Sequence, residues 1–282
     1  MLKRRLEKID TLPAMPTIAQ KLLSLKIETF DGESALLKLI EQDPQLSAKI
    51  IGLANSPLLS SSRKTSSING AAMLLGMSRV KSIAIGIAAI SALTQMPQSK
   101  LNVTELWLHS LTVALSMRAI AQFIPEQSRP DDDQIFLAGL LHDIGYLVLS
   151  YLDTKLSDQL HEQICQEHST ISTLEIEQNL LGITHCELSA QLALNWGLEN
   201  NIVSALRNHH LSDFFHNKDS IDNTLAVLIT LAEKLLPSFG ATNLEKRIGQ
   251  QEWELLGIDP DKSEDIYTSV NNQIEHAKQL AI

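Results

Sequence analysis

Histidine and acidic residues recur along this sequence in positions where they could bind a metal ion. His142 and Asp143 are adjacent within residues 137–149, LAGLLHDIGYLVL, which we expect to form one continuous apolar helix. A buried carboxylate costs several kcal/mol unless it meets a cation or a full set of donors, so Asp143 needs a partner. Neighbouring helical residues point about 100° apart, which lets both side chains meet one ion between them. The alternative is that both satisfy local backbone groups.

Two further histidines lie in other expected helices. His109 falls on the apolar face of a helix that begins near Thr104. His185 follows Thr184, which with Glu187 has the pattern of a capping box, so His185 should lie in the first turn of a helix. The alternatives are a hydrogen-bonded core histidine at position 109 and an exposed surface histidine at position 185.

The remaining candidates lie near helix ends. His209 and His210 end an expected helix, with His209 on its inner face, and Glu233 lies among leucine residues beside Lys234. The simpler interpretation of the two histidines is a positively charged side chain at a helix C-terminus, and that of Glu233 is an exposed Glu-Lys edge. Imidazole and carboxylate together suit divalent iron, manganese, nickel, zinc or magnesium, and this ligand set does not choose among them.

The elements that must position these residues are helices. Apolar residues make up 44% of the chain and aromatic residues only 4%, with apolar positions recurring every three to four residues. Asp43 and Pro44 are typical of a helix start, as are Asp259 and Pro260. The sequence shows no clear strand alternation and therefore predicts an all-α fold.

The sequence suggests three parts. Residues 95–100, QMPQSK, separate an N-terminal helical part, 1–97, from a central part, 98–240, which carries the candidate ligands. The boundary is short enough that the two parts should pack together. Residues 241–282 are rich in polar residues and should add one or two surface helices.

Charge and hydropathy exclude several classes of function. The chain has 23 basic and 33 acidic residues, a net charge of −10, and no basic stripe, so nucleic acid is not expected as a partner. The longest apolar stretch, residues 83–93, is about half the length of a bilayer span, and the N-terminus does not resemble a secretory signal. We therefore expect a cytoplasmic protein. The two cysteines, Cys165 and Cys186, are interpreted as small apolar residues in helices.

The order of the candidate ligands resembles the HD phosphohydrolase superfamily, whose metal site combines a histidine, a His-Asp pair and a distal aspartate. The matching positions are His109, His142, Asp143 and Glu233. Glu233 departs from the family, which has aspartate there. Members with a second metal add later histidines, which His185, His209 and His210 resemble, so these three are candidates for binding a second metal or a substrate. The resemblance implies a helical bundle that holds a divalent metal, with Asp143 as the catalytic candidate.

The N-terminal part narrows the resemblance to the HDOD branch of this superfamily. The segments that carry it are LPAMP at 12–16, IEQDP at 40–44, LANS at 53–56, LLGMSRV at 74–80 and WGL at 196–198. Together with the His209-His210 doublet they cover about residues 10 to 240. The resemblance implies a bacterial signalling module that acts through contacts with partner proteins.

The alternative function is a metal-dependent phosphohydrolase acting on a nucleotide or phosphomonoester. Arg207 would then be a candidate phosphate partner, although its support is weak. Hydrolysis of cyclic di-GMP is not expected. The hydrolases of that class continue their His-His doublet into a Glu and a Gly-Tyr-Pro turn, whereas residues 211–215 here are LSDFF.

Overall fold

A computed structural model describes residues 12–56, 64–94, 99–167, 171–210, 224–236 and 248–278. Within these ranges the regular elements are α-helices and two short 3-10 helices, with no strand, which confirms the all-α prediction. The first helices are α2 (Thr17–Ser24), α3 (Phe30–Glu41), α4 (Pro44–Ala54), α5 (Ile68–Leu75) and α6 (Met77–Leu93). Then come α7 (Val103–Ala121), η2 (Glu126–Ser128), α8 (Asp132–Leu141), α9 (Ile144–Leu152), α10 (Thr154–Glu167) and α11 (Thr173–Leu181). The last are α12 (His185–Asn195), α13 (Asn200–Asn208), α14 (Thr224–Leu235), α15 (Gln250–Leu255), η5 (Pro260–Lys262) and α16 (Ser263–Lys278).

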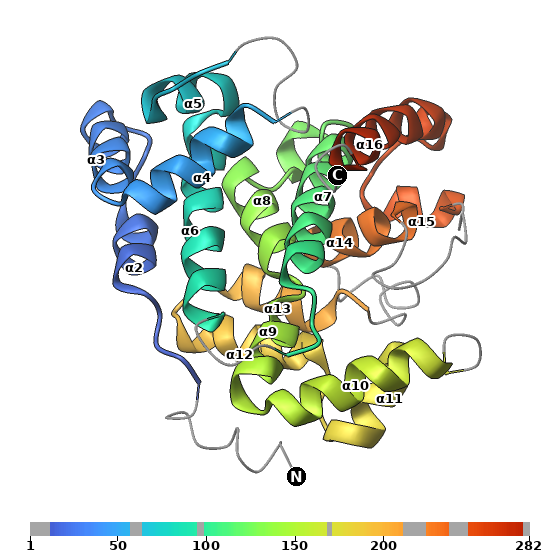
Figure 1. Ribbon diagram of the computed structural model, residues 1–282. Helices are drawn as coiled ribbons and strands as arrows, with labels where there is room; N and C mark the ends of the chain where they lie inside the picture. The colour runs from blue at the N-terminus through green and yellow to red at the C-terminus, as the bar shows by residue number, and fades with distance from the viewer. Residues whose placement is uncertain are drawn as a thin grey trace.

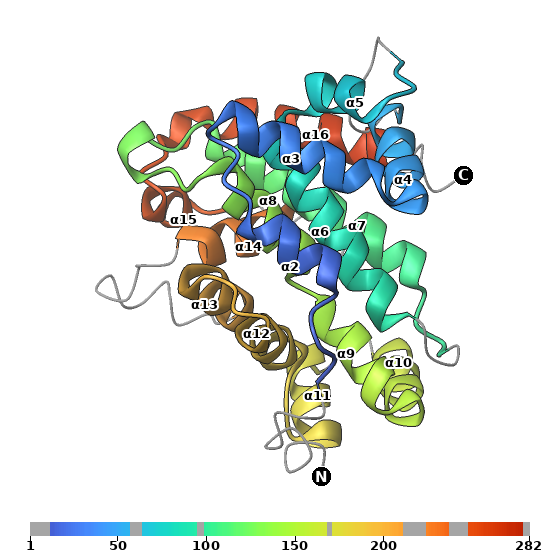
Figure 2. The ribbon, with the colours of Figure 1, turned by 90° about the vertical axis from the view of Figure 1, so that its left-hand side faces the viewer.

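The helices pack around α8. Helices α3, α4 and α5 lie at one end of the molecule and α10 and α11 at the other, as both views show (Figures 1 and 2). Helix α8 contacts α6, α7, α13 and α14. The candidate ligands therefore lie on helices that meet at the centre of the molecule.

Local sequence explains where α4 begins. Asp43 caps the helix by accepting hydrogen bonds from the backbone N–H groups of Gln45 and Leu46, both at 3.0 Å. Pro44 occupies the first helical position, where its missing N–H costs nothing. This confirms the predicted helix start. The expected helix near Asp259 and Pro260 begins instead with the short η5, which leads into α16.

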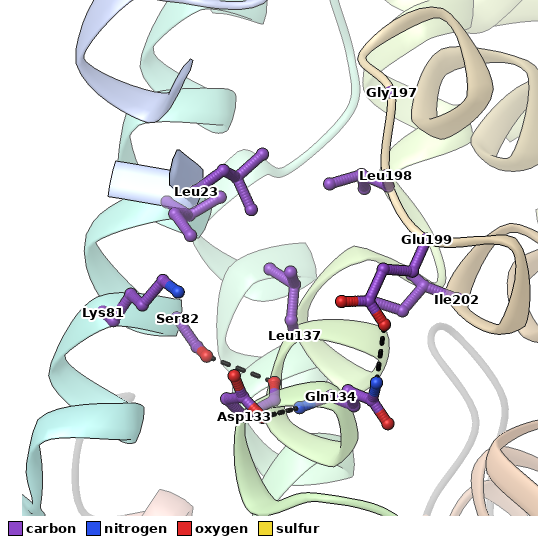
Figure 3. Close-up of a pocket in the computed structure, with 11 residues that line it drawn as sticks. Leu23, Lys81, Ser82, Asp133, Gln134, Leu137, Gly197, Leu198, Glu199 and Ile202 are labelled. Carbon is purple, nitrogen blue, oxygen red and sulfur yellow. Dashed lines mark hydrogen bonds between the residues drawn. The ribbon is translucent and has the colours of Figure 1, made fainter. Parts of the chain in front are cut away.

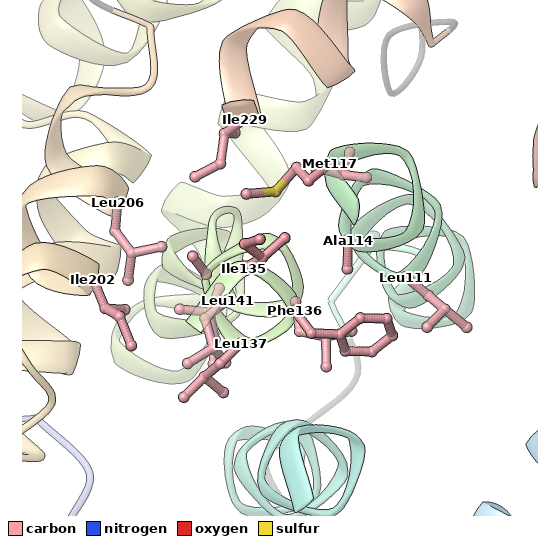
Figure 4. Close-up of a cluster of buried hydrophobic side chains, with 14 of the residues drawn as sticks. Leu111, Ala114, Met117, Ile135, Phe136, Leu137, Leu141, Ile202, Leu206 and Ile229 are labelled. Carbon is pink, nitrogen blue, oxygen red and sulfur yellow. The ribbon is translucent and has the colours of Figure 1, made fainter. Parts of the chain in front are cut away.

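The core around α8 is aliphatic and closely packed. Figure 4 shows Phe136 and Leu137 of α8 among side chains from α7, α13 and α14. Gly139 lets α7 and α8 approach closely, because a Cβ atom there would lie 2.5 Å from the Cα atom of Ala114. This contact brings the helix that carries His109 against the helix that leads to His142.

The N-terminal helices pack directly on the ligand-bearing part. Buried Trp196 donates from its indole Nε1 to the carbonyl oxygen of Pro13 at 2.9 Å, and the Ser82 hydroxyl donates to the carbonyl of Asp133 at 3.3 Å. A cavity of about 190 Å³ lies at this junction, between α6, α8 and the start of α13 (Figure 3). The predicted boundaries, 97/98 and 240/241, fall outside the described residues, so they stay predictions.

The C-terminal helices are attached to the body of the protein. Helix α16 packs on α7 with Ile266 and Val270 buried, and Trp253 of α15 is also buried. Helix α16 therefore covers one side of α7. Among the described helices, none by itself has the length and apolarity needed to cross a bilayer.

Candidate metal centre

His142 and Asp143 lie at a break between two helices. Helix α8 ends at Leu141 and α9 begins at Ile144, with a bend of 40° between them. The prediction of one continuous helix through residues 137–149 is therefore wrong. Ser189 of α12 supports the break: its hydroxyl donates to the His142 carbonyl and accepts from the Gly145 N–H, both at 2.8 Å.

Gly145 allows helix α12 to approach this break closely. A Cβ atom at position 145 would lie 2.1 Å from the carbonyl oxygen of His185. Only glycine permits that approach, because the nearest atom is backbone and cannot move aside easily. The start of α12, with His185, is thereby held against the His142-Asp143 pair.

Four of the predicted residues form a first group of candidate ligands. Its members are His109 from α7, His142 and Asp143 from the helix break, and Glu233 from α14. Asp143 Oδ2 lies 3.3 Å from His142 Nε2 and 3.6 Å from His109 Nε2. Glu233 Oε1 lies 3.4 Å from His142 Nε2. Glu233, with its longer side chain, thus reaches the other three residues from the position where the HD superfamily has aspartate.

A second group adjoins the first. Its members are His185 and Cys186 from the first turn of α12, and His209 and His210 from the end of α13. The side chains of His185 and His209 are buried, so the alternative of a surface position for His185 is wrong. His210 is one-third exposed. Cys186 was not among the predicted ligands.

Two carboxylates connect the groups. Asp143 turns Oδ2 toward His109 and His142, and turns Oδ1 toward His185 Nε2 at 3.3 Å. Glu233 turns Oε1 toward His142, and Oε2 toward His210 Nδ1 at 3.4 Å. The arrangement can therefore hold two neighbouring cations that share both carboxylates.

Backbone carbonyls fix the orientation of two imidazoles. His142 Nδ1 lies 2.8 Å from the carbonyl oxygen of Gly139, and His209 Nδ1 lies 2.8 Å from that of Leu206. Because a carbonyl only accepts, Nδ1 carries the proton in each ring. The Nε2 atoms, which face the two groups, are then the atoms available to a metal.

Glu177 orients the third imidazole and was not predicted. This fully buried carboxylate lies 2.8 and 2.9 Å from His185 Nδ1, and also accepts from the His185 N–H and the Tyr146 hydroxyl. Tyr146 stacks on the His185 ring with centroids 4.6 Å apart. Carboxylates in this outer position are typical of metal-binding histidines.

Inner and outer distances of the histidines differ in a way that fits a cation shared by the inner ligand atoms. The outer contacts of the histidines are ordinary hydrogen bonds of 2.8–2.9 Å. The inner contacts of His142 with the two carboxylates are 3.3 and 3.4 Å, longer than the ~2.8 Å of a charge-assisted hydrogen bond. They match instead the ~3.4 Å between nitrogen and oxygen ligands of one tetrahedral ion.

Two buried polar atoms at the same place have no hydrogen-bond partner within the described ranges of the chain. They are His142 Nε2 and Glu233 Oε2. Buried polar atoms in folded proteins are nearly always paired, so an unpaired nitrogen beside two carboxylates is a candidate metal ligand. The donor set and these unpaired atoms fit a divalent metal.

The pKa values of neighbouring groups in the site are shifted in opposite directions. Burial opposes protonation of His142, but Asp143 and Glu233 outweigh it and raise its pKa to about 10. Burial also opposes ionisation of Glu233, but His210 and His142 lower the pKa of that carboxyl to about 2. Burial lowers the pKa of His209 well below its usual value. Protons therefore occupy part of the place that a cation would take.

The cap of α12 is only partly as predicted. Thr184 is the N-cap and accepts from the Glu187 N–H at 3.3 Å. The Glu187 carboxylate, however, pairs with Arg207, whose Nε lies 2.8 Å away. Arg207, the candidate phosphate partner, is therefore already engaged by an acid.

The fold and this ligand arrangement define an HD-type helical protein. The sequence model of the HDOD domain family matches residues 12–212. The chain therefore belongs to the HDOD domain family. A comparison with functionally curated proteins found no match.

Solved structures share the fold. An HDOD domain protein from Geobacter sulfurreducens is 24% identical with a TM-score of 0.80, covering 99% of this chain and 95% of its own. A proposed signal transduction protein from Marinobacter aquaeolei is 25% identical with a TM-score of 0.77, and the match covers 98% of this chain. This chain spans only 60% of the Marinobacter protein. A proposed metal-dependent phosphohydrolase from Shewanella amazonensis is 20% identical, with a TM-score of 0.62 and coverage of 98% and 97%.

Proposed function

We propose that this chain is a signal-transduction module of the HDOD family that holds a divalent metal centre and acts through contacts with a partner protein. Family membership and the likeness to the Marinobacter protein, described as a proposed signal transduction protein, support the signalling role. The observation that carries the metal centre is the buried, unpaired Nε2 of His142 beside Asp143 and Glu233.

In this role the metal stabilises the helical body. The ligands come from α7, the break between α8 and α9, α12, α13 and α14, so one centre ties together helices that are far apart in sequence. A cation there would offset the charges of Asp143 and Glu233. Metal binding and folding are then coupled, because the unfolded chain has no such site. Iron, manganese, nickel, zinc and magnesium remain the candidate ions.

Two exposed apolar side chains on the N-terminal helices could contribute to a partner contact. Phe30 of α3 and Met73 of α5 are each 83% exposed. Helices α3 and α5 contact each other and lie at the same end of the molecule (Figure 1). Large exposed apolar side chains are available for burial against another protein. This end of the molecule is therefore the candidate surface for a signalling partner.

Affinity capture with the full-length chain tests the signalling role. Three baits are compared: the wild type, a double variant with Phe30→Ser and Met73→Ser, and a control with Leu194→Ser. The control changes another exposed apolar residue, which lies on α12 and is 58% exposed. We expect the wild type and the control to recover a specific partner from the source cells and the double variant to lose it. Failure of the wild type to recover any specific partner, with the signalling network intact, contradicts the proposal.

A metal-dependent phosphohydrolase is the alternative, and the two shared carboxylates favour it. Paired metal sites bridged in this way lower the pKa of bound water and polarise phosphoryl oxygens. Asp143, with one oxygen toward each group, is the residue placed to hold both ion and water. A phosphate that used Arg207 would have to displace Glu187.

Turnover separates the alternatives. Protein loaded with manganese, iron or nickel would be assayed against phosphomonoesters and nucleotides, with His142→Ala as the inactive control. Hydrolysis that the His142 variant abolishes supports the phosphohydrolase. Full metal occupancy without hydrolysis of any substrate rules it out and leaves the signalling role.

A further inference from the structure

The second group of ligands contains a thiol. Cys186 follows His185 in the first turn of α12 and is buried. Its Sγ lies 3.4 Å from His185 Nε2 and 3.9 Å from His209 Nε2. Interpretation of Cys186 as a small apolar residue explains its burial. A thiol has one proton, so as a hydrogen-bond donor it can serve only one of these two imidazole nitrogens at a time.

The sulfur–nitrogen distances suit a shared tetrahedral ion. Zinc binds cysteine sulfur at about 2.3 Å and histidine nitrogen at about 2.0–2.1 Å, which places the two ligand atoms about 3.6 Å apart. The two observed distances, 3.4 and 3.9 Å, lie on either side of this value. One ligand atom from each of the four side chains, His210 included, lies within 4.8 Å of every other.

Independent features also point to a ligand here. Glu233 Oε2, a buried atom without a hydrogen-bond partner, lies 3.4 Å from His210 Nδ1. His142, whose fully buried Nε2 is also unpaired, has its ring 5.4 Å from that of His209. Two polar atoms that have no hydrogen-bond partner among the described residues thus border the thiol-containing group.

We propose that Cys186 is a metal ligand, and that the second group binds a thiophilic divalent ion, zinc fitting best, through three imidazoles and one thiolate. A sulfur–metal bond forms, and the thiol proton leaves to solvent. Thiolate ligands select zinc or iron over magnesium and manganese. The first group has two imidazoles and two carboxylates and no sulfur. The two groups therefore prefer different ions. This inference rests on the metal centre of the proposed function.

Cobalt provides a direct optical test on the full-length chain. Metal-free protein is titrated with Co²⁺, and the near-ultraviolet band of thiolate-to-cobalt charge transfer is followed together with the visible bands of bound cobalt. We expect the charge-transfer band in the wild type and in Cys165→Ser, which changes the exposed cysteine of α10. Cys186→Ser should lose that band while keeping the visible absorption of cobalt in the first group.

The outcomes separate the two proposals. No cobalt bound by the wild type overturns the metal centre and the role of Cys186 together. Bound cobalt without a charge-transfer band, or with a band that persists in Cys186→Ser, overturns the role of Cys186 alone. X-ray absorption at the zinc edge of the wild type needs no variant: a sulfur neighbour at about 2.3 Å supports the assignment, and a shell of nitrogen and oxygen only overturns it.

Discussion

Asp143 lies at the break between α8 and α9, and its Oδ1 atom lies 3.3 Å from the Nε2 atom of His185 in the first turn of α12. The other oxygen of the same carboxylate faces His109 and His142. Asp143 is therefore, with Glu233, one of the two carboxylates that connect both groups of candidate ligands. Removing its charge should affect both groups together, whereas a change in a residue of one group should affect that group first.

We expect Asp143→Asn to lose metal at both groups. The amide keeps the size of the side chain but removes the negative charge that both groups share. Elemental analysis of protein purified without chelator measures the loss. Asp131→Asn, which changes an exposed carboxylate before α8, is the control and should keep the wild-type metal content. Unchanged metal content in Asp143→Asn would show that this carboxylate is not a ligand.

Glu177 is a positioning residue for His185, and Glu177→Gln should weaken metal binding at the second group. Outer carboxylates of this kind typically change metal affinity by about 10–100-fold. Competition with a chromophoric chelator measures the affinity. Affinity at the first group should change less, because Glu177 accepts hydrogen bonds from the backbone N–H and the ring of His185, which belongs to the second group. Equal loss at both groups would contradict a role specific to His185.

Metal affinity should rise with pH. His142 in the metal-free protein has a pKa of about 10, and the pKa of His185 is also raised well above its usual value, by Glu177 against the opposing effect of burial. A metal must therefore displace protons at neutral pH. Calorimetry in buffers of different ionisation enthalpy should detect the released protons. Affinity that is independent of pH would contradict this assignment.

The free energy of unfolding of the metal-free protein should fall as the pH rises, in contrast to the metal affinity. Stabilisation by protonated His142 is fully present below the unfolded pKa of 6.5 and is lost as the pH rises toward about 10. Burial lowers the pKa values of His109 and His209 below 6.5. These two histidines therefore change the free energy of unfolding only below pH 6.5 and do not oppose this loss. Urea unfolding with chelator present measures the trend. Rising stability across this range would contradict it.

Close packing of α7 on α8 predicts a large cost for Gly139→Ala. The added Cβ atom would lie 2.5 Å from the Cα atom of Ala114, so the helices must separate. We expect a loss of about 1–3 kcal/mol in the free energy of unfolding, measured in urea with chelator present. Gly52→Ala is the matched control, since nothing lies within 4 Å of its Cβ position in α4. The control should gain about 0.5–1 kcal/mol. A neutral Gly139→Ala would contradict the close approach.

Helical periodicity was enough to predict the fold class, and together with the resemblance to the HD superfamily it selected seven side chains that the structure brings together. The spacing marks His109 and His209 as inward-facing, and that information is local. The role of the seven side chains as metal ligands stays a prediction. The pattern could not predict the break at His142, because the hydroxyl that supports it belongs to Ser189, on another helix.

Glu177 and Cys186 were missed for related reasons. The contact of Glu177 with His185 joins two helices across a turn, and its own segment has several other acidic and amide residues that look equivalent in sequence. Adjacency of Cys186 to His185 was an available signal. Its burial agreed equally well with an apolar role, and only the position of His209 near the sulfur distinguishes the two.

The most direct test of the metal centre is elemental analysis of the full-length wild type, purified without chelator, beside His142→Ala. The account predicts tightly bound divalent metal in the wild type and a loss of the ion held by the first group in the variant. A wild-type protein that is correctly folded but holds no divalent metal, even after incubation with zinc, iron and manganese, would contradict it.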